Sequence, residues 1–159
     1  MAEIICIDFH GVLTDGKVNV SHDGKTFFES CHTRDVRAIR ELVASGHEVY
    51  IVTASMNPIV LAFAEKVGVV VIQARDKSEI PVIFKKSYIA IGDDAWDVPM
   101  LEKAVHAFCP ADADPCVKSL PHIRILNSKG GQGVIAELVP LLALSTKIRK
   151  TARKQRYSQ

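Results

Sequence analysis

The chain has 159 residues, of which 48% are hydrophobic, and this is enough for one well-buried core. No apolar run approaches the roughly 18–20 residues that a membrane span needs, and no basic patch interleaved with aromatic residues supports nucleic-acid binding. The first predicted strand begins near the N-terminus and leaves no room for a signal peptide. We therefore expect a soluble cytoplasmic protein without a nucleic-acid or membrane partner.

The elements predicted along the chain alternate between short apolar runs, typical of buried strands, and segments with helical periodicity. Strands are predicted over residues 4–8, 48–53, 69–72, 88–91, 106–109 and 122–126. Helices are predicted over residues 34–45, 57–67, 96–104 and 134–144, with at most a short helix within 79–86. Thr33 is the candidate N-cap of the first helix, while His32 could cap a helix or reach an active site. Trp96 and Met100 are expected to pack within their helix. The alternation predicts an α/β fold with a doubly wound, mostly parallel sheet.

One insertion interrupts this alternation directly after the first strand. Residues 17–20 and 26–29 flank Asp23-Gly24, a pair that suits a tight turn with positive φ. A β-hairpin is predicted to project from the domain at this point.

Charge is distributed unevenly along the chain. Residues 147–159 contain six basic side chains and no acidic one, so residues 1–146 hold 14 basic and 18 acidic side chains. We expect one domain over residues 1–146 and a basic C-terminal tail over 147–159. Such a tail can bind nucleic acid or anionic lipid, but basic ends are commonly just solvated, and we favour a solvated end.

Two carboxylate clusters directly follow predicted strands. The first strand leads into Asp8, and Gly11 lets the backbone turn away from it. The second cluster begins at Asp93, after the strand over residues 88–91. Open α/β sheets bind ligands beyond the carboxyl ends of their strands, and carboxylate oxygens are ligands that Mg²⁺ prefers. The two clusters therefore predict a Mg²⁺ site.

A phosphoryl-transfer site needs a carboxylate nucleophile, a hydroxyl that orients the phosphoryl oxygens, a fixed cation and a divalent metal ion. Asp8 is the candidate nucleophile, Thr53 the hydroxyl and Lys77 the cation. Asp93 completes the metal site. Taken singly, each residue has another explanation, since Asp and Thr often cap helices and a lysine is often a solvated charge. Their order, at intervals of about one βα unit, favours the site.

With these residues in place, the chain resembles the haloacid dehalogenase superfamily, and within it the capless family of 3-deoxy-D-manno-octulosonate 8-phosphate phosphatases. The resemblance extends from about Ile4 to Leu142. It rests on the run from Asp8 to Gly16, Arg34-Asp35, Val52-Thr53, Gln73 with Lys77, Gly92-Asp93-Asp94 with Asp97, and Gly130-Gly131-Gln132-Gly133.

This resemblance implies a fold without a large cap domain and an aspartyl-phosphate intermediate at Asp8. It implies a Mg²⁺ ion held by Asp8, by the backbone carbonyl of His10 and by Asp93. It also implies a homotetramer in which the hairpins associate and neighbouring subunits cover the active site.

One departure from the family concerns the residue that carries the proton. Two positions after the nucleophile the family has a second aspartate, which acts as general acid for the leaving alcohol and then as base for water. This chain has His10 there. Imidazoles can exchange protons near neutral pH, so His10 could do the same work. It could instead donate a fixed hydrogen bond and leave a slow or trapped phosphoenzyme.

A second departure concerns the contacts to substrate. Arginine is common in the family where this chain has Ser55, Gln132 and Ala136, so three side chains that could bind an anion are missing. The glycine-rich loop over residues 129–133 is either a plain turn or a loop that contacts substrate, and the resemblance favours the second. The residues expected to bind substrate are Arg34, Ser55, Gly131 and Gln132.

Together these features predict a Mg²⁺-dependent phosphomonoesterase that hydrolyses a small phosphorylated metabolite, with an acidic sugar phosphate as one candidate. The alternative is a catalytically impaired scaffold or regulatory subunit that keeps affinity for Mg²⁺ and phosphate. His10 and the missing arginines are the observations that favour this alternative.

Overall fold

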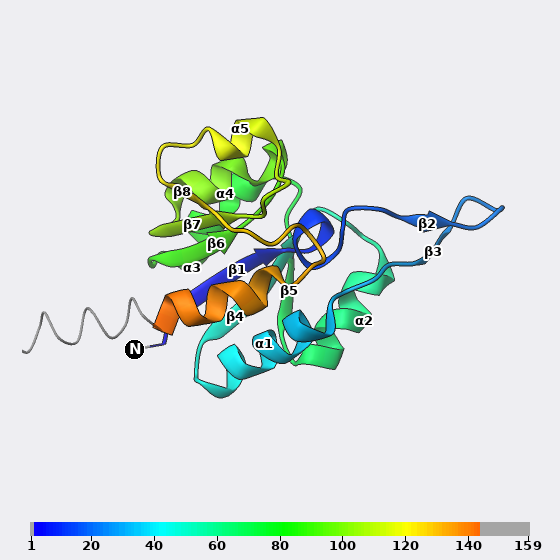
Figure 1. The fold of residues 1–159 in the computed structure, drawn as a ribbon, viewed down its shortest axis with the longest axis horizontal. Coiled ribbons are helices and arrows are strands. Elements are labelled where there is room, and N and C mark those ends of the chain that lie inside the picture. The colour runs from blue at the N-terminus through cyan, green and yellow to red at the C-terminus, as the bar shows by residue number, and fades with distance from the viewer. Residues whose placement is uncertain (1, 144–159) are drawn as a thin grey trace, which may run out of the picture.

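The computed structural model describes residues 2–143, and at its centre lies a six-stranded sheet (Figure 1). The strand order is β5-β4-β1-β6-β7-β8, and all neighbouring strands are parallel. The strands are β1 Ile4–Asp8, β4 Glu48–Thr53, β5 Val70–Gln73, β6 Tyr88–Ile91, β7 His106–Cys109 and β8 Ile123–Ile125. The chain winds outward from β1 to β5 and then returns to β6 on the other side of β1. The carboxyl ends of β1 and β6 thus meet where the winding reverses, which is where such sheets bind ligands.

Helices cover both faces of this sheet. One layer holds α1 Thr33–Ala44, α2 Pro58–Val67 and a last helix over residues 134–143. The other holds α3 Ile80–Phe84, α4 Val98–Lys103 and α5 Pro115–Lys118. Three short turns, η1 Phe9–Leu13, η2 Lys77–Glu79 and η3 Ala95–Asp97, lie between the longer elements. The doubly wound α/β fold is confirmed, whereas α5 and the short turns were not predicted.

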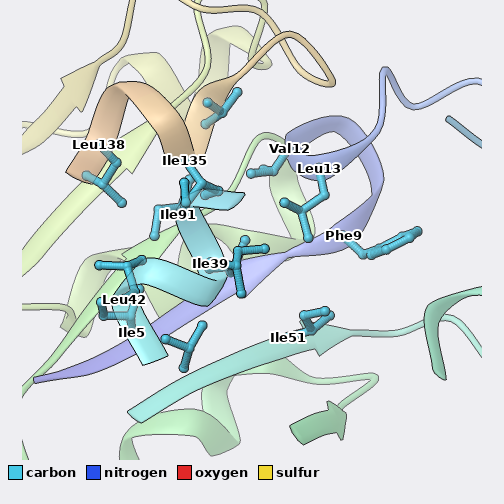
Figure 2. Packing of buried hydrophobic residues seen from close by; sticks show 14 of the residues in the cluster. Ile5, Phe9, Val12, Leu13, Ile39, Leu42, Ile51, Ile91, Ile135 and Leu138 are labelled. Atoms are coloured by element: carbon cyan, nitrogen blue, oxygen red, sulfur yellow. The ribbon is translucent and has the colours of Figure 1, made fainter. Parts of the chain in front are cut away.

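The side chains of β1 alternate between the two layers. Ile5 and Ile7 pack with α1 and the last helix, and Figure 2 shows this cluster from close by. Ile4 and Cys6 pack on the opposite side with α3, α4 and α5. Burying one aliphatic side chain of this size contributes about 1.5–3 kcal/mol to folding. Because both faces are covered, β1 is a fixed support for the residue at its end.

The ends of α1 show one difference from the prediction. The helix begins at Thr33, and its N-cap is His32, whose Nδ1 accepts a hydrogen bond from the Arg34 N–H over 3.1 Å. Thr33 was expected to be the cap, but the extended backbone of His32, with φ −74° and ψ 132°, places the boundary one residue earlier. Gly46 follows the C-cap Ser45 and has φ 86°, the left-handed conformation in which helices commonly end.

The hairpin forms a separate two-stranded sheet that projects from the domain (Figure 1). Its strands are β2 Asn19–Val20 and β3 Thr26–Phe28, which pair antiparallel with one irregularity in register. Gly24 occupies the turn at φ 80°. Within residues 2–143, this hairpin is the insertion between β1 and α1, and no large cap domain is present.

The basic segment over residues 147–159 lies outside the described residues, and its role stays a prediction. Within residues 2–143, the helices are all too short or too polar to cross a membrane.

Candidate active site

Asp8 stands at the carboxyl end of β1 and is only 6% exposed. The chain leaves the sheet there through η1, in which His10 has ψ 126° and Gly11 has φ 83°. The Thr14 N–H closes this turn by donating to the Phe9 carbonyl over 3.1 Å. The turn therefore presents the Asp8 carboxylate to the space beyond the sheet and then carries the backbone away.

Lys77 lies between two buried carboxylates. Its Nζ donates to Oδ1 of Asp8 and to Oδ1 of Asp97, each over 2.5 Å, and the residue is 4% exposed. Burial alone would lower the pKa of Lys77, but the two carboxylates outweigh it and hold the pKa above its usual value. Burial, followed by the charge of Asp97, raises the pKa of Asp8 despite the attraction of Lys77. Lys77 is thus a fixed cation in contact with the candidate nucleophile.

Asp97 also shapes the loop after β6. Its Oδ2 accepts hydrogen bonds from the N–H groups of Asp93 and Asp94, over 2.8 and 3.2 Å. With Oδ1 on Lys77 and Oδ2 on these two amides, Asp97 holds the loop and the lysine in place. The role of Asp97 was not predicted, because nothing in the spacing showed that one carboxylate would bind both the lysine and the backbone of the loop.

Asp93 lies beside Asp8 and Asp97 and has a side-chain oxygen that is free to bind a ligand. Its Oδ1 is buried and finds no hydrogen-bond partner among the residues that the structure describes. Burial, together with the charges of Asp97 and Asp94, raises the pKa of Asp93 to about 7. A buried carboxylate oxygen without a partner is costly, and a cation would relieve it.

The cluster fits a divalent metal ion on two counts. One carboxylate oxygen each from Asp8, Asp93 and Asp97 lie within 4.8 Å of one another. With the single charge of Lys77, the ionised cluster has a net charge of −2, which a divalent cation would balance. The turn leaves room for this arrangement, since a Cβ on Gly11 would lie 2.0 Å from Oδ2 of Asp93. Hard oxygen ligands of this type suit Mg²⁺.

A hollow of about 350 Å³ opens beside this cluster, and of the three carboxylates Asp8 lines it, whereas Asp93 and Asp97 do not. It brings together five of the predicted site residues and four others. The hydroxyl of Thr53 accepts the Ser55 N–H over 3.0 Å at the end of β4. The lining residues are Asp8, His10, Thr53, Ala54, Ser55, Arg75, Lys77, Asp94 and Trp96.

Arg75 and Trp96 line the hollow without having been predicted to do so. Trp96 was expected to pack within a helix, but that expectation is wrong, because it is 68% exposed at the mouth of the hollow. The reason is local: Asp94 accepts the Trp96 N–H over 2.8 Å and starts η3, a tight turn that directs the indole outward. Met100 is fully buried, as expected.

Three residues that were expected to bind substrate do not line the hollow over Asp8. Arg34 lines a different hollow, between α1 and the last helix. Gly131 donates its N–H to the Val12 carbonyl over 2.9 Å, and a Cβ there would lie 2.7 Å from the Asp15 nitrogen. Gln132 is exposed and does not line the hollow over Asp8. The glycine-rich loop thus packs against the turn after β1, and this close approach explains Gly130 and Gly131.

One further contact joins the site to the hairpin. Nε2 of His10 lies 3.1 Å from Oε1 of Glu29, which directly follows β3. No motif singled out Glu29, because the contact depends on where the hairpin returns to the domain.

Comparison with known proteins supports the predicted resemblance. No protein-family model matches the chain. The 3-deoxy-D-manno-octulosonate 8-phosphate phosphatase KdsC of Salmonella typhi is 28% identical over 152 residues, which cover 89% of this chain and 79% of that protein.

Solved structures share the fold over most of its length. A putative haloacid dehalogenase family hydrolase from Streptomyces avermitilis superposes with a TM-score of 0.79 at 25% identity, covering 87% of this chain and 88% of that one. A putative 3-deoxy-D-manno-octulosonate 8-phosphate phosphatase from Vibrio cholerae gives a TM-score of 0.78 at 26% identity, covering 87% of this chain and 81% of that one. With the strand order and the acidic cluster described above, these likenesses support a haloacid dehalogenase superfamily protein of the KdsC-like type.

Proposed function

We propose that the protein is a Mg²⁺-dependent phosphomonoesterase that acts on a small sugar phosphate. The observation that carries this proposal is the position of Lys77, which contacts the carboxylates of Asp8 and Asp97 over 2.5 Å. Beside it lies Oδ1 of Asp93, which has no hydrogen-bond partner within residues 2–143. A buried cation beside a nucleophile is what an incoming phosphoryl group requires. The names of the relatives, which are phosphatases, support the same reaction class.

The covalent step begins at Asp8. One of its oxygens attacks the phosphorus atom, the bond from phosphorus to the leaving oxygen breaks, and an aspartyl phosphate forms. Lys77 neutralises charge on the transferred group, and the Thr53 hydroxyl orients one of its oxygens. Both residues line the hollow over Asp8, which is the support for these roles.

His10 handles the protons of both half-reactions. Its imidazole gives a proton to the leaving alkoxide, so that the alcohol departs neutral. It then takes a proton from the water that attacks the aspartyl phosphate, which frees inorganic phosphate and the Asp8 carboxylate. His10 lines the same hollow, which supports this assignment over a purely structural one.

Mg²⁺ would be held by Asp8 and Asp93, with the backbone carbonyl of His10 as a further ligand. When bound, it neutralises negative charge on the transferring phosphoryl group and on the carboxylates. The balance of charges in the cluster supports this site, as does Oδ1 of Asp93, which lacks a hydrogen-bond partner in the described part of the chain. Asp97 is the positioning residue, since both of its oxygens are already engaged.

The walls of the hollow indicate the class of leaving group. Arg75 supplies a guanidinium for an anion, and the exposed indole of Trp96 offers an apolar face on which a sugar ring can stack. Together they suit an acidic sugar phosphate, the class to which the named substrate of the relatives belongs. In this chain Arg75 would supply part of the positive charge that is missing at Ser55, Gln132 and Ala136.

A turnover assay tests the proposal. The purified protein is incubated with p-nitrophenyl phosphate and with a panel of sugar phosphates, 3-deoxy-D-manno-octulosonate 8-phosphate included, with Mg²⁺ or with EDTA. We expect Mg²⁺-dependent release of phosphate that Asp8→Asn abolishes. Glu65→Gln, which makes the same change at an exposed position of α2, should leave it intact. Release that is unaffected by EDTA or by Asp8→Asn would overturn the proposal.

The competing idea of an impaired scaffold rests on His10 and the missing arginines, whereas the geometry favours an active site. The nucleophile, the cation and the acidic cluster converge, and His10 faces the same hollow. His10→Asp separates the two: a large gain in turnover would show that the histidine impairs the site, while a loss would show that it is the working proton carrier.

Assembly as a homotetramer stays a prediction. On the hairpin, Val18 and Val20 are 51% and 56% exposed. Exposed apolar side chains of this kind are expected in the single chain if the hairpin pairs with another copy. Sedimentation of the purified protein measures the assembly directly.

A further inference from the structure

His10 has a partner that the mechanism above does not use. Its Nε2 lies 3.1 Å from Oε1 of Glu29, whose side chain is 1% exposed, against 30% for that of His10. The histidine therefore faces the hollow while its partner is buried behind it. Glu29 comes from the segment between β3 and α1, so the return of the hairpin brings it to the site.

The bonding of Glu29 is unusual for a structural carboxylate. Its Oε2 is buried and has no hydrogen-bond partner within the part of the chain that the structure describes. Glu137 shows the contrast, since its Oε1 accepts from the backbone and side-chain nitrogens of Asn127 over 2.9 Å, and its Oε2 from the Ser128 N–H over 2.8 Å. A buried carboxylate with one oxygen unused costs stability, and such costs are found where function requires the group.

Two contacts fix the orientation of the His10 ring. Besides the bond to Glu29, the ring meets Phe9 edge to face, with 5.1 Å between the ring centroids and 78° between the ring planes. Phe9 is fully buried, so its ring is held in place by the core. With Nε2 directed at Glu29, Nδ1 is the ring nitrogen left to serve a reacting oxygen in the hollow.

We propose that Glu29 is a positioning residue that holds His10 with a proton on Nε2 and so reserves Nδ1 for catalysis. The proposal rests on the proposed phosphatase function, and it uses the principle by which a buried carboxylate sets the tautomer and orientation of a catalytic histidine. In the first half-reaction Nδ1–H gives its proton to the leaving oxygen as the bond to phosphorus breaks. In the second, Nδ1 takes a proton from water as the water oxygen bonds to phosphorus and the Asp8 carboxylate leaves. Nε2 keeps its proton, and Glu29 its hydrogen bond, throughout.

Glu29→Gln tests this role, because it keeps the size of the side chain while its amide can turn and donate to Nε2 instead. The readout is a comparison of leaving groups in the Mg²⁺-loaded enzyme. p-Nitrophenolate leaves without a proton, whereas the alkoxide of a sugar needs one. We therefore expect kcat/KM on a sugar phosphate to fall by about 10-fold or more, a part of the 10²–10⁴ that general acid catalysis supplies. On p-nitrophenyl phosphate kcat/KM should stay unchanged, while kcat and KM fall together.

The same variant should show a burst of p-nitrophenolate in the first turnover. The burst arises because the hydrolysis of the aspartyl phosphate still needs Nδ1 as base, so the phosphoenzyme accumulates. In a His10→Asp background Glu29→Gln should cost nothing, since the imidazole is gone. Glu137→Gln is the matched control, because that glutamate bonds to Asn127 and Ser128 away from the hollow, and it should affect both substrates alike or neither.

Equal losses of kcat/KM on both substrates, or no loss on either, would overturn the proposal. A ¹⁵N correlation spectrum of the histidines separates this outcome from a failure of the proposed function. His10 should carry its proton on Nε2 in the parent protein, and Glu29→Gln should shift protons toward Nδ1. If the parent shows this signature without phosphatase turnover, the proposed function fails and the positioning role of Glu29 stands. If the parent carries its proton on Nδ1 alone, the positioning role fails.

Discussion

Lys77→Met removes the positive charge that pairs with Asp8 and Asp97 while keeping a long, flexible side chain. In the parent, Nζ lies 2.5 Å from an oxygen of Asp8 and 2.5 Å from an oxygen of Asp97. The side chains of these three residues are at most 9% exposed, so water cannot replace the lost cation. The variant should therefore be less stable than the parent, and most so without Mg²⁺.

The size of the loss follows from the burial. Removing one partner of a buried ion pair costs about 3–5 kcal/mol, because the remaining charge stays uncompensated. For a chain of this length each kcal/mol lowers the melting temperature by about 2–4 °C, so the expected fall is roughly 6–20 °C. The fall should shrink at lower pH, since burial raises the pKa of Asp8 and the carboxyl can take up a proton in place of the lost partner. Mg²⁺ should restore part of the stability, because it brings positive charge back to the cluster.

Circular dichroism melts in EDTA and in millimolar Mg²⁺ measure these differences. Lys103→Met, which removes an exposed lysine from the end of α4, is the control and should change little. Turnover of Lys77→Met should be lost even with Mg²⁺ present, since the metal does not replace the cation at the transferred group. A melting temperature equal to that of the parent in EDTA would show that the carboxylates do not depend on Lys77, and the charge balance described above would be wrong.

Three further predictions concern the metal site and the wall of the hollow. The pKa of Asp93 is raised to about 7 in the folded protein, above its usual 3.8. In the metal-free protein, protonation of Asp93 therefore stabilises the fold fully below pH 3.8, and this stabilisation is lost as the pH rises through about 7. Mg²⁺ should therefore raise the melting temperature more at pH 8 than at pH 5. Gly11→Ala and Gly46→Ala, with φ of 83° and 86°, should each lose about 1–2 kcal/mol to backbone strain. Calorimetry should detect Mg²⁺ binding in Gly46→Ala but not in Gly11→Ala, whose new Cβ would collide with Asp93, whereas nothing lies within 4 Å at Gly46. Trp96→Ala should raise KM for a sugar phosphate roughly 2–12-fold, the loss expected for about 0.5–1.5 kcal/mol of stacking; an unchanged KM would remove the indole from the substrate site.

The features that the sequence predicted well are those that apolar patterns determine. The strands end where the apolar runs end, so the places of Asp8 and Thr53 at strand ends followed from the pattern, as did the position of Asp93 after its strand. The parallel alternation then placed these ends at one edge of the sheet, and the structure brings Lys77 to the same edge. Periodicity carries this information because a buried strand needs an apolar face on both sides.

The features that escaped prediction depend on the geometry of single turns. The direction of the Trp96 side chain is set by η3, and the double role of Asp97 by hydrogen bonds within the same turn. Glu29 meets His10 through the path of the hairpin, a contact between residues 19 positions apart that no local pattern encodes. Arg34 likewise lies next to the predicted motifs in sequence, yet the helix carries its side chain to another hollow.

Exposure divides the residues of the hollow into two groups. The residues proposed to act on phosphorus, Asp8, Thr53 and Lys77, are almost inaccessible, whereas Trp96 stands 68% exposed on the outer rim. A substitution on the rim leaves the central strands untouched, so the choice of substrate can diverge through surface changes alone. Under the proposed function, reactivity and selectivity are thus separable properties of this scaffold, and exchange of the rim residues is the direct route to redirecting it toward other phosphate esters.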